Sequence, residues 1–138
     1  MEGIARGERV FLRGPSGSGK STLAGLLLRF HEAQQGTLTM GGVALSEIAD
    51  ADFHRLVAYV PQDPFLLAGS LASNIDFGFG ANRAQIEDAA ARAGLVPFVR
   101  SLPQGLDTPV GERGSALSAG QRQQVILARA LLRKPAVL

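Results

Sequence analysis

The segment Gly14–Thr22, with the sequence GPSGSGKST, constrains this chain more than any other. It fits the phosphate-loop pattern G-x-x-x-x-G-K-[ST], which requires Gly14, Gly19, Lys20 and Ser21 at their positions. Glycine lets the backbone wrap closely around a phosphate because no Cβ stands in the way. Consecutive amides then point inward at the start of a helix, whose dipole favours an anion. The lysine reaches the β- and γ-phosphates, and the hydroxyl after it ligates Mg²⁺.

The neighbours of this loop predict a strand before it and a helix after it. Arg9–Arg13 contains the short β-prone run Val-Phe-Leu, and the stretch from Lys20 to Glu32 contains the apolar helix former TLAGLLLRF. A glycine-rich turn without a ligand is the alternative interpretation. Because strand and helix lie on the correct sides, the sequence favours a loop that holds a nucleoside triphosphate.

Composition limits the chain to one domain and excludes several kinds of site. Its 138 residues are 46% hydrophobic, and a domain of this length buries about two-thirds of its unfolded surface. The net charge of +2 comes with scattered arginines, so we expect no nucleic-acid groove. The absence of cysteine excludes disulfides and thiolate metal sites. No signal-peptide pattern is visible, and no apolar run is long enough to span a bilayer.

The rest of the chain alternates between predicted strands and helices. Strands are expected at Gly36–Met40, followed by a tight Gly-Gly turn, and at Leu56–Val60, which a proline ends. An Asn-x-x-Gln capping box opens a helix over Arg83–Ala93, and a Ser-x-x-Gln box opens another over Ala119–Arg133. Ala136–Leu138 has the character of a further buried strand. The pattern predicts an α/β core that carries a smaller helical lobe.

Three further segments resemble the ATPase domain of ABC (ATP-binding cassette) transporters. In chain order they are YVPQDP at Tyr59–Pro64, DTPVGERG at Asp107–Gly114 and LSAGQ at Leu117–Gln121. Each is weak evidence alone, but the ordered set with the phosphate loop is specific and covers nearly the whole chain. The segment PFLLAGSLASNI at Pro64–Ile75 and the VGERG run are similar to the exporter branch, because importer ATPases usually lack VGERG.

This resemblance implies a fold and its internal boundaries. The fold is of the α/β class: a P-loop NTPase (RecA-like) core with a small antiparallel β portion and a helical subdomain, incomplete at both ends. We expect residues 1–138 to form a partial ABC ATPase domain. Within it, residues 1–61 are the P-loop core with the β portion, 62–122 the helical subdomain, and 123–138 the return to the core.

The resemblance also implies the residues that bind ATP and Mg²⁺. Lys20 and Gln62 would be catalytic, and Ser21 and Gln62 would bind Mg²⁺. The LSAGQ segment would present a helix start to the γ-phosphate held by another subunit. The expected nucleotide-binding residues are Gly14, Pro15, Ser16, Gly17, Ser18, Gly19, Lys20, Ser21, Thr22, Gln62, Ser118, Ala119, Gly120 and Gln121. Taken alone, the Ser-x-x-Gln box is more typical of a plain helix cap, and Gln62 is more typical of an ordinary turn.

The same resemblance implies partners and a location. The expected partners are a second ABC ATPase domain, identical or different, in a head-to-tail dimer around two ATP molecules, and the transmembrane domains of a transporter. No nucleic-acid partner is expected. The place is the cytoplasmic face of the cell membrane, which we expect to be a bacterial inner membrane.

The sequence departs from the family pattern in three places. Ala119 stands at the third position of the LSAGQ segment, where the family usually has a glycine. Its methyl group either crowds the γ-phosphate or is harmless at a negative φ. The family's acidic pair and switch histidine would follow Leu138, and its adenine-stacking aromatic would precede Met1. We therefore expect a piece of a longer polypeptide, marginally stable and nearly inactive in hydrolysis by itself.

Two functions of different kinds follow. The first is an ATP-binding cassette domain that binds ATP and, in the full-length protein, hydrolyses it to power export across a membrane. The second is a non-hydrolysing module for ATP-dependent dimerisation or regulation. A DNA-repair ATPase that shares the LSxGQ element is a third, against which the exporter-like segments argue.

Overall fold

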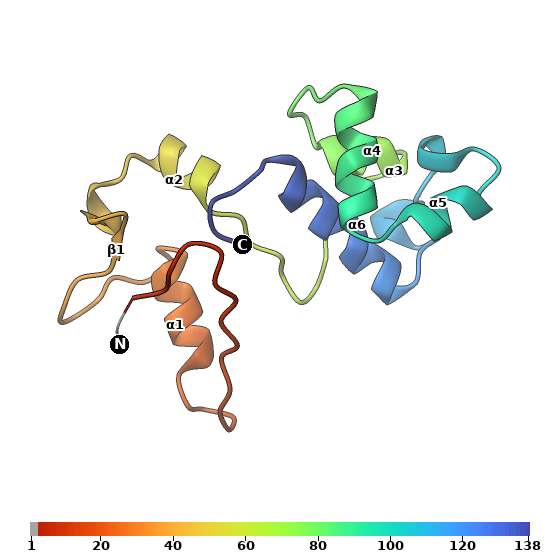
Figure 1. Ribbon diagram of the computed structural model, residues 1–138. Helices are drawn as coiled ribbons and strands as arrows, with labels where there is room; N and C mark the ends of the chain where they lie inside the picture. Colours follow the sequence, from red (N-terminus) through yellow and green to blue (C-terminus); the bar gives the residue numbers. More distant parts are fainter. Residues whose placement is uncertain (1–2) are drawn as a thin grey trace. The chain divides into compact units, whose positions relative to one another are not determined.

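The computed structural model describes residues 3–138 and divides into two compact units, one up to Ala49 and one from Asp50 onward (Figure 1). None of the helices in this described part is long and apolar enough to cross a membrane. The first unit contains α1 (Lys20–Leu27), β1 (Thr39–Met40), β2 (Val43–Ala44) and the 3₁₀ turn η1 (Leu45–Glu47). The second contains α2 (Asp50–Leu56), α3 (Leu71–Asp76), α4 (Arg83–Arg92), α5 (Val96–Ser101), η2 (Gly105–Asp107), η3 (Glu112–Gly114) and α6 (Ala119–Leu132).

The first unit holds the glycine-rich loop and a short hairpin. Helix α1 ends before the predicted Glu32, because Arg29 adopts a left-handed backbone with φ 60°. Strands β1 and β2 pair antiparallel, with Thr39 opposite Ala44. The turn between them is the predicted Gly41–Gly42, whose positive φ angles of 59° and 85° are typical of a two-residue hairpin.

The strand predicted at Arg9–Arg13 is not formed. This segment is irregular, and Val10 and Phe11 are 55% and 79% exposed. A strand of a parallel sheet is held by hydrogen bonds to neighbouring strands, and both of its faces are covered. Within residues 3–138 no strand pairs with this segment. The apolar run has the composition of a strand but lacks the partner that would make it one.

The second unit contains the beginning of a parallel pairing. Val57 and Val137 form an isolated parallel bridge, and the Ala58 amide donates to the Val137 carbonyl at 2.9 Å. The two segments predicted as strands, Leu56–Val60 and Ala136–Leu138, are therefore neighbours. The predicted burial of the second is wrong, since Val137 is 47% exposed.

Both predicted capping boxes are present. The Asn82 side chain accepts from the Gln85 amide at 3.0 Å, and the Gln85 side chain accepts from the Asn82 amide at 2.9 Å. The same exchange joins Ser118 and Gln121 at 3.2 and 2.8 Å. Each box satisfies two amides that a helix start leaves unpaired. Helices α4 and α6 accordingly begin where the sequence predicts, and Gly94 follows α4 with φ 77°.

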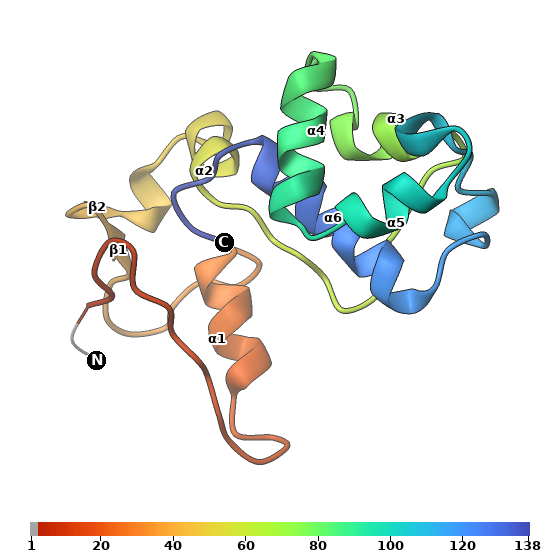
Figure 2. The same ribbon diagram turned by 45° about the vertical axis from the view of Figure 1, so that its right-hand side comes forward.

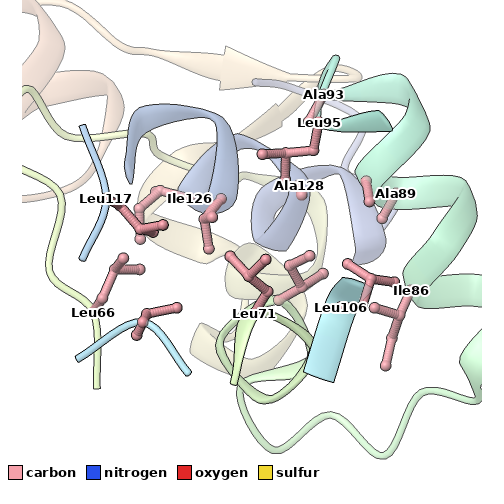
Figure 3. Packing of buried hydrophobic residues seen from close by; sticks show 14 residues of the cluster. Leu66, Leu71, Ile86, Ala89, Ala93, Leu95, Leu106, Leu117, Ile126 and Ala128 are labelled. Atoms are coloured by element: carbon pink, nitrogen blue, oxygen red, sulfur yellow. The ribbon is translucent and has the colours of Figure 1, made fainter. Parts of the chain in front are cut away.

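Helix α6 is the central element of the second unit. It packs against α3 and α4, as Figure 2 shows. Val125 and Ala128 of its predicted apolar face are completely buried. Figure 3 shows how side chains from α3, α4 and the intervening loops close around this face. The largest fully buried apolar side chains are Leu66, Leu71, Ile75, Leu95, Val110 and Val125.

One polar side chain, Asn74 of α3, lies inside this core. It is only 1% exposed, and its oxygen accepts from the Leu67 amide at 2.9 Å. Its nitrogen donates to the carbonyls of Leu67 and Ser70 at 2.9 and 3.0 Å. Because a buried amide side chain is tolerated only with its hydrogen bonds made, Asn74 fixes the loop that precedes its own helix.

Arg129 of α6 fastens the same region from the other side. Its Nε donates to the Asn74 carbonyl at 2.8 Å and its Nη1 to the Phe65 carbonyl at 3.4 Å. The guanidinium lies 3.9 Å from the centroid of the Phe77 ring. Burial lowers the pKa of Arg129, and the carbonyl dipoles and the aromatic face compensate its charge.

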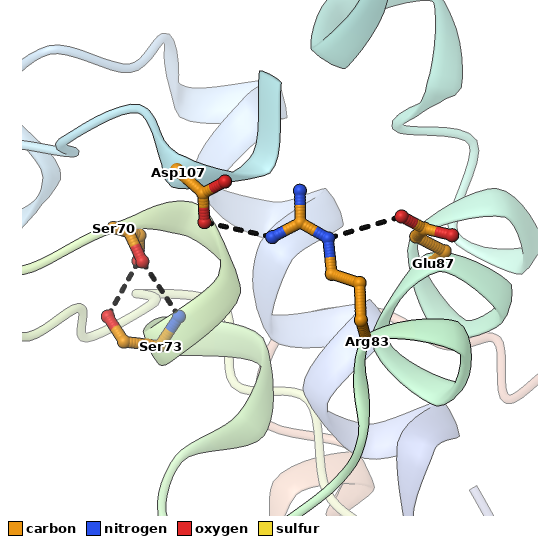
Figure 4. Close-up of polar contacts among 5 residues, drawn as sticks. All are labelled: Ser70, Ser73, Arg83, Glu87 and Asp107. Atoms are coloured by element: carbon orange, nitrogen blue, oxygen red, sulfur yellow. Dashed lines mark hydrogen bonds and ion pairs between the residues drawn. The ribbon is translucent and has the colours of Figure 1, made fainter. Parts of the chain in front are cut away.

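The outer surface of the unit carries an ion-pair cluster between α4 and η2. Arg83 bonds the carboxylates of Asp107 at 2.8 Å and Glu87 at 3.1 Å (Figure 4). The hydrogen bond to Asp107, followed by that to Glu87, raises the pKa of Arg83. All three side chains are exposed, so solvent screens their attraction. Figure 4 also shows Ser70, whose hydroxyl caps α3 by accepting from the Ser73 amide at 3.0 Å.

Replacing Asn74 with alanine should destabilise the second unit by about 3 kcal/mol, because the buried side chain and its hydrogen bonds to the Leu67 amide and carbonyl would be lost. Hydrogen exchange of the Val125 amide in the intact protein measures this loss, since Val125 lies in the middle of α6. Arg83→Ala is the control and should leave the exchange rate unchanged. Equal exchange in both variants would show that Asn74 does not hold the core together.

Candidate phosphate-binding site

The two glycines that the phosphate-loop pattern requires, Gly14 and Gly19, serve different physical needs. Gly19 precedes α1 with φ 87°, a left-handed conformation that other residues adopt only with strain. A Cβ on Gly14 would lie 2.6 Å from the Ser18 hydroxyl oxygen, so the Ser18 side chain would have to move. Gly14 therefore lets the Ser18 side chain approach the loop backbone, and Gly19 provides the conformation that turns the loop into the helix.

The start of α1 offers several backbone amides to a ligand. The first hydrogen bond of this helix runs from the Leu23 amide to the Gly19 carbonyl at 2.9 Å. The amides of Lys20, Ser21 and Thr22 lie before this bond, so no carbonyl within the helix accepts from them. Within residues 3–138 no side chain caps this helix start. An anion would satisfy these donors and would also be stabilised by the helix dipole.

Lys20 folds back over the loop. Its ammonium donates to the carbonyls of Gly14 at 2.7 Å and Pro15 at 2.6 Å, and to the Ser18 hydroxyl at 3.3 Å. An ammonium has three protons, so all three donors are used. To contact a phosphate, Lys20 exchanges loop oxygens for phosphate oxygens without losing a hydrogen bond. The loop itself therefore holds the cation next to the anion site.

The oxygens available for Mg²⁺ are neutral. In the described part of the chain no group of three or more His, Cys, Asp or Glu side chains is placed to hold a metal ion. Ser21 has an exposed hydroxyl at the start of α1, and Gln62 has an exposed amide in the second unit. Mg²⁺ prefers oxygen ligands and is commonly held by one or two protein groups together with substrate phosphates. Each of these oxygens suits Mg²⁺ that is bound mainly through a nucleotide.

Gln62 lies on an exposed turn whose two ends are fastened to α6. The Gln123 side chain donates to the Pro61 carbonyl at 3.1 Å, and Arg129 donates to the Phe65 carbonyl at 3.4 Å. The sequence did not predict either contact, because no local pattern indicates that two residues more than sixty positions apart will bond. The only available signal was the polar character of Gln123 and Arg129 beside an apolar helix face.

The LSAGQ segment forms the exposed first turn of α6. Ser118 is the cap residue and Ala119 the first helical residue, so Ala119 has an unstrained helical backbone. The plain helix cap is confirmed, while binding of a phosphate by Ser118–Gln121, including Ala119, stays a prediction. A Cβ on Gly120 would meet no atom within 4 Å, so this helix start is open on its outer side.

The VGERG loop packs against both of these segments. The Val110 amide donates to the Gly69 carbonyl at 2.8 Å, next to the loop that follows Gln62. A Cβ on Gly114 would lie 2.7 Å from Leu66 and 3.0 Å from Arg122 of α6. Three motifs that are far apart in the sequence therefore belong to one packed body. The phosphate loop belongs to the first unit.

Comparison with known proteins gives a consistent assignment. A family model described as ABC transporter matches residues 2–138. The chain is 43% identical over 136 residues to an uncharacterized ABC transporter ATP-binding protein of Bacillus subtilis, covering 98% of this chain and 24% of that protein. It is 41% identical over 136 residues to an ATM1-type heavy metal exporter of Novosphingobium aromaticivorans, covering 98% and 22%.

A solved structure supports the same assignment. It is described as a bacterial Atm1-family ABC exporter with ATP bound, and it matches with a TM-score of 0.80 and 41% identity. The match covers 88% of this chain and 21% of that one. The chain therefore spans less than a quarter of the length of each of these relatives.

Replacing Ser118 with alanine should destabilise the first turn of α6 by about 1 kcal/mol, because the Gln121 amide would lose its cap. Ser118→Asp should not, since aspartate caps a helix as well as serine does. Hydrogen exchange of the Gln121 amide in the intact protein distinguishes the two variants. Equal protection in Ser118→Ala and the parent would exclude the capping role.

Proposed function

The chain belongs to the ABC transporter family, and we propose that it is the ATP-binding cassette domain of an exporter. In the full-length protein it would bind ATP with Mg²⁺ and hydrolyse the nucleotide to power export across a membrane. The observation that carries this proposal is the open row of amides at the start of α1, with Lys20 held beside it by the loop. That arrangement is built for a polyphosphate.

Each part of the loop has a role in this proposal. The amides of Lys20, Ser21 and Thr22 would donate to the β- and γ-phosphate oxygens, and the Lys20 ammonium would neutralise their charge. The remaining loop residues, Gly14 to Gly19, would wrap the chain around the phosphates. Ser21 and Gln62 would bind Mg²⁺, whose charge offsets that of the transferred phosphoryl group. Gln62 would also orient the attacking water.

A second copy of the domain would complete the site. The exposed first turn of α6, Ser118–Gln121, would face the γ-phosphate bound by the partner in a head-to-tail dimer. An N-terminal helix turn favours an anion, and the neutral side chains of this turn add no opposing charge. Such a dimer places ATP between two chains, so that nucleotide binding and closure become one event.

Exposed aromatic side chains support a partner in the membrane. Phe65, Phe77 and Phe79 are all exposed in the second unit. Arg129 stacks on Phe77 and Arg133 on Phe79, so these rings are ordered against the C-terminal half of α6. Large apolar side chains that stay exposed are candidates for an interface. We propose that this surface contacts the transmembrane domains, so that the domain would lie at the cytoplasmic face of the membrane.

A non-hydrolysing dimerisation module is the second candidate. Ala119 favours it, because its methyl group lies on the turn that would approach the γ-phosphate. ATP-dependent association without release of phosphate would identify this module.

Lys20→Met should abolish ATP binding in the intact protein, with at least a 100-fold weaker affinity, because the stem remains while the charge is lost. Lys134→Met is a matched control, since Lys134 is the only other lysine of the chain, and it should bind as the parent does. Equilibrium binding of a fluorescent ATP analogue measures both. Unchanged binding by Lys20→Met would refute the proposed site.

Ser118→Asp should keep α6 folded and keep ATP binding by each monomer, but it should abolish ATP-dependent association. The new carboxylate caps the helix and then repels the partner's γ-phosphate. Sedimentation with and without Mg-ATP measures the association, and Ser115→Asp on the neighbouring exposed loop serves as the charge control. Association of Ser118→Asp at the parent's ATP concentration would exclude the head-to-tail arrangement.

A further inference from the structure

The peptide group that carries Gln62 is held by a side chain of α6. The Gln123 side chain donates to the Pro61 carbonyl at 3.1 Å. This carbonyl and the Gln62 amide belong to one planar peptide unit, so fixing the oxygen also fixes the plane from which Gln62 starts. Within residues 3–138 the Gln62 side chain itself is exposed and forms no hydrogen bond.

The segment that carries Gln62 runs from Pro61 to Phe65, and its Phe65 end is also held by α6. Arg129 donates to the Phe65 carbonyl at 3.4 Å and to the Asn74 carbonyl at 2.8 Å. Gln123 and Arg129 are separated by about 9 Å along α6, at 1.5 Å per residue. Four residue steps from Pro61 to Phe65 reach up to about 14 Å, so this short segment is fastened to α6 at both of its ends.

Helix α6 connects this anchor to the LSAGQ turn. Gln123 lies two residues after Gln121, in the turn that follows the capping box. A helix of this length moves as one body, so a displacement of its first turn carries the Gln123 amide with it. The Pro61 carbonyl, and with it the base of Gln62, would follow.

We propose that Gln123 is a positioning residue that sets Gln62 relative to the first turn of α6. The inference rests on the proposed function, because it acts only if Gln62 takes part in ATP hydrolysis. Closure of the LSAGQ turn on a γ-phosphate would then also bring Gln62 to its working position. The hydrogen bond from Gln123 to the Pro61 carbonyl would couple the LSAGQ turn to Gln62.

The neighbouring residue provides an internal comparison. Gln124 makes the same kind of contact, from its side-chain nitrogen to the Gly94 carbonyl at 3.2 Å. Both glutamines are half-buried and lie in the same turn of α6. Gly94 belongs to the connection after α4, which has no part in the site. Loss of either hydrogen bond should therefore lower the free energy of unfolding by a similar amount. Only loss of the Gln123 bond would change the position of Gln62.

The test measures ATP hydrolysis by the full-length protein over a range of ATP concentrations. Gln123→Ala should lower kcat about 10-fold with KM changed less than about two-fold, because the water-orienting group is misplaced while the phosphate loop is intact. Gln123→Glu should show the same loss, since a carboxylate cannot donate to the carbonyl. Gln124→Ala should keep the kcat of the parent. Equal kcat values for Gln123→Ala and Gln124→Ala would overturn the proposal.

A double-mutant cycle with Gln62→Ala identifies the route of the effect. If Gln123 acts through Gln62, adding Gln123→Ala to Gln62→Ala should cause no further loss of kcat. Additive losses would overturn the positioning role, as would a Gln62→Ala variant with the parent's kcat. A parent protein that binds but never hydrolyses ATP would overturn the proposed export ATPase itself and this inference with it. An active parent with additive losses overturns only the inference.

Discussion

The contact between Arg129 and Asn74 holds the second unit in its shape. Asn74 is buried and fixes the loop before α3, and Arg129 joins that loop to α6. Together with the burial of Leu66, these contacts fasten the far end of the segment that carries Gln62. The VGERG loop approaches the same place closely, since a Cβ on Gly114 would lie 2.7 Å from Leu66 and 3.0 Å from Arg122 of α6. The buried polar contact thus helps to keep three separate motifs in a single body.

The two helix starts of the candidate site are prepared for an anion in different ways. The start of α1 has no side-chain cap, so its amides are left to the ligand. The start of α6 is capped, and the Gln121 amide is already bonded to Ser118. It therefore offers only its first amides and its dipole. This difference is consistent with the proposal, in which the start of α1 would be the primary phosphate site and the start of α6 would make a secondary contact when the dimer closes.

Features set by neighbouring residues could be predicted from the sequence, and features set by distant residues could not. The capping boxes at Asn82 and Ser118 were predicted correctly because cap and partner are three residues apart. The strand Arg9–Arg13 was predicted wrongly because a strand depends on partners elsewhere in the chain. Asn74, Gln123 and Arg129 were missed for the same reason, although the motifs that they hold together were all found.

The hydrogen bonds that Lys20 makes within the loop determine where the free energy of phosphate binding would come from. In the free loop its ammonium already has three oxygen partners, so a phosphate adds no hydrogen bond there. What changes is the charge of the acceptor, since phosphate oxygens carry formal charge and carbonyl oxygens carry only a dipole. The gain from the amides of α1 is of another kind, because no side chain caps this helix start before binding. Affinity at this loop would therefore come from charge neutralisation at Lys20 and from preorganised donors at the helix start, and both favour a polyphosphate over a neutral ligand.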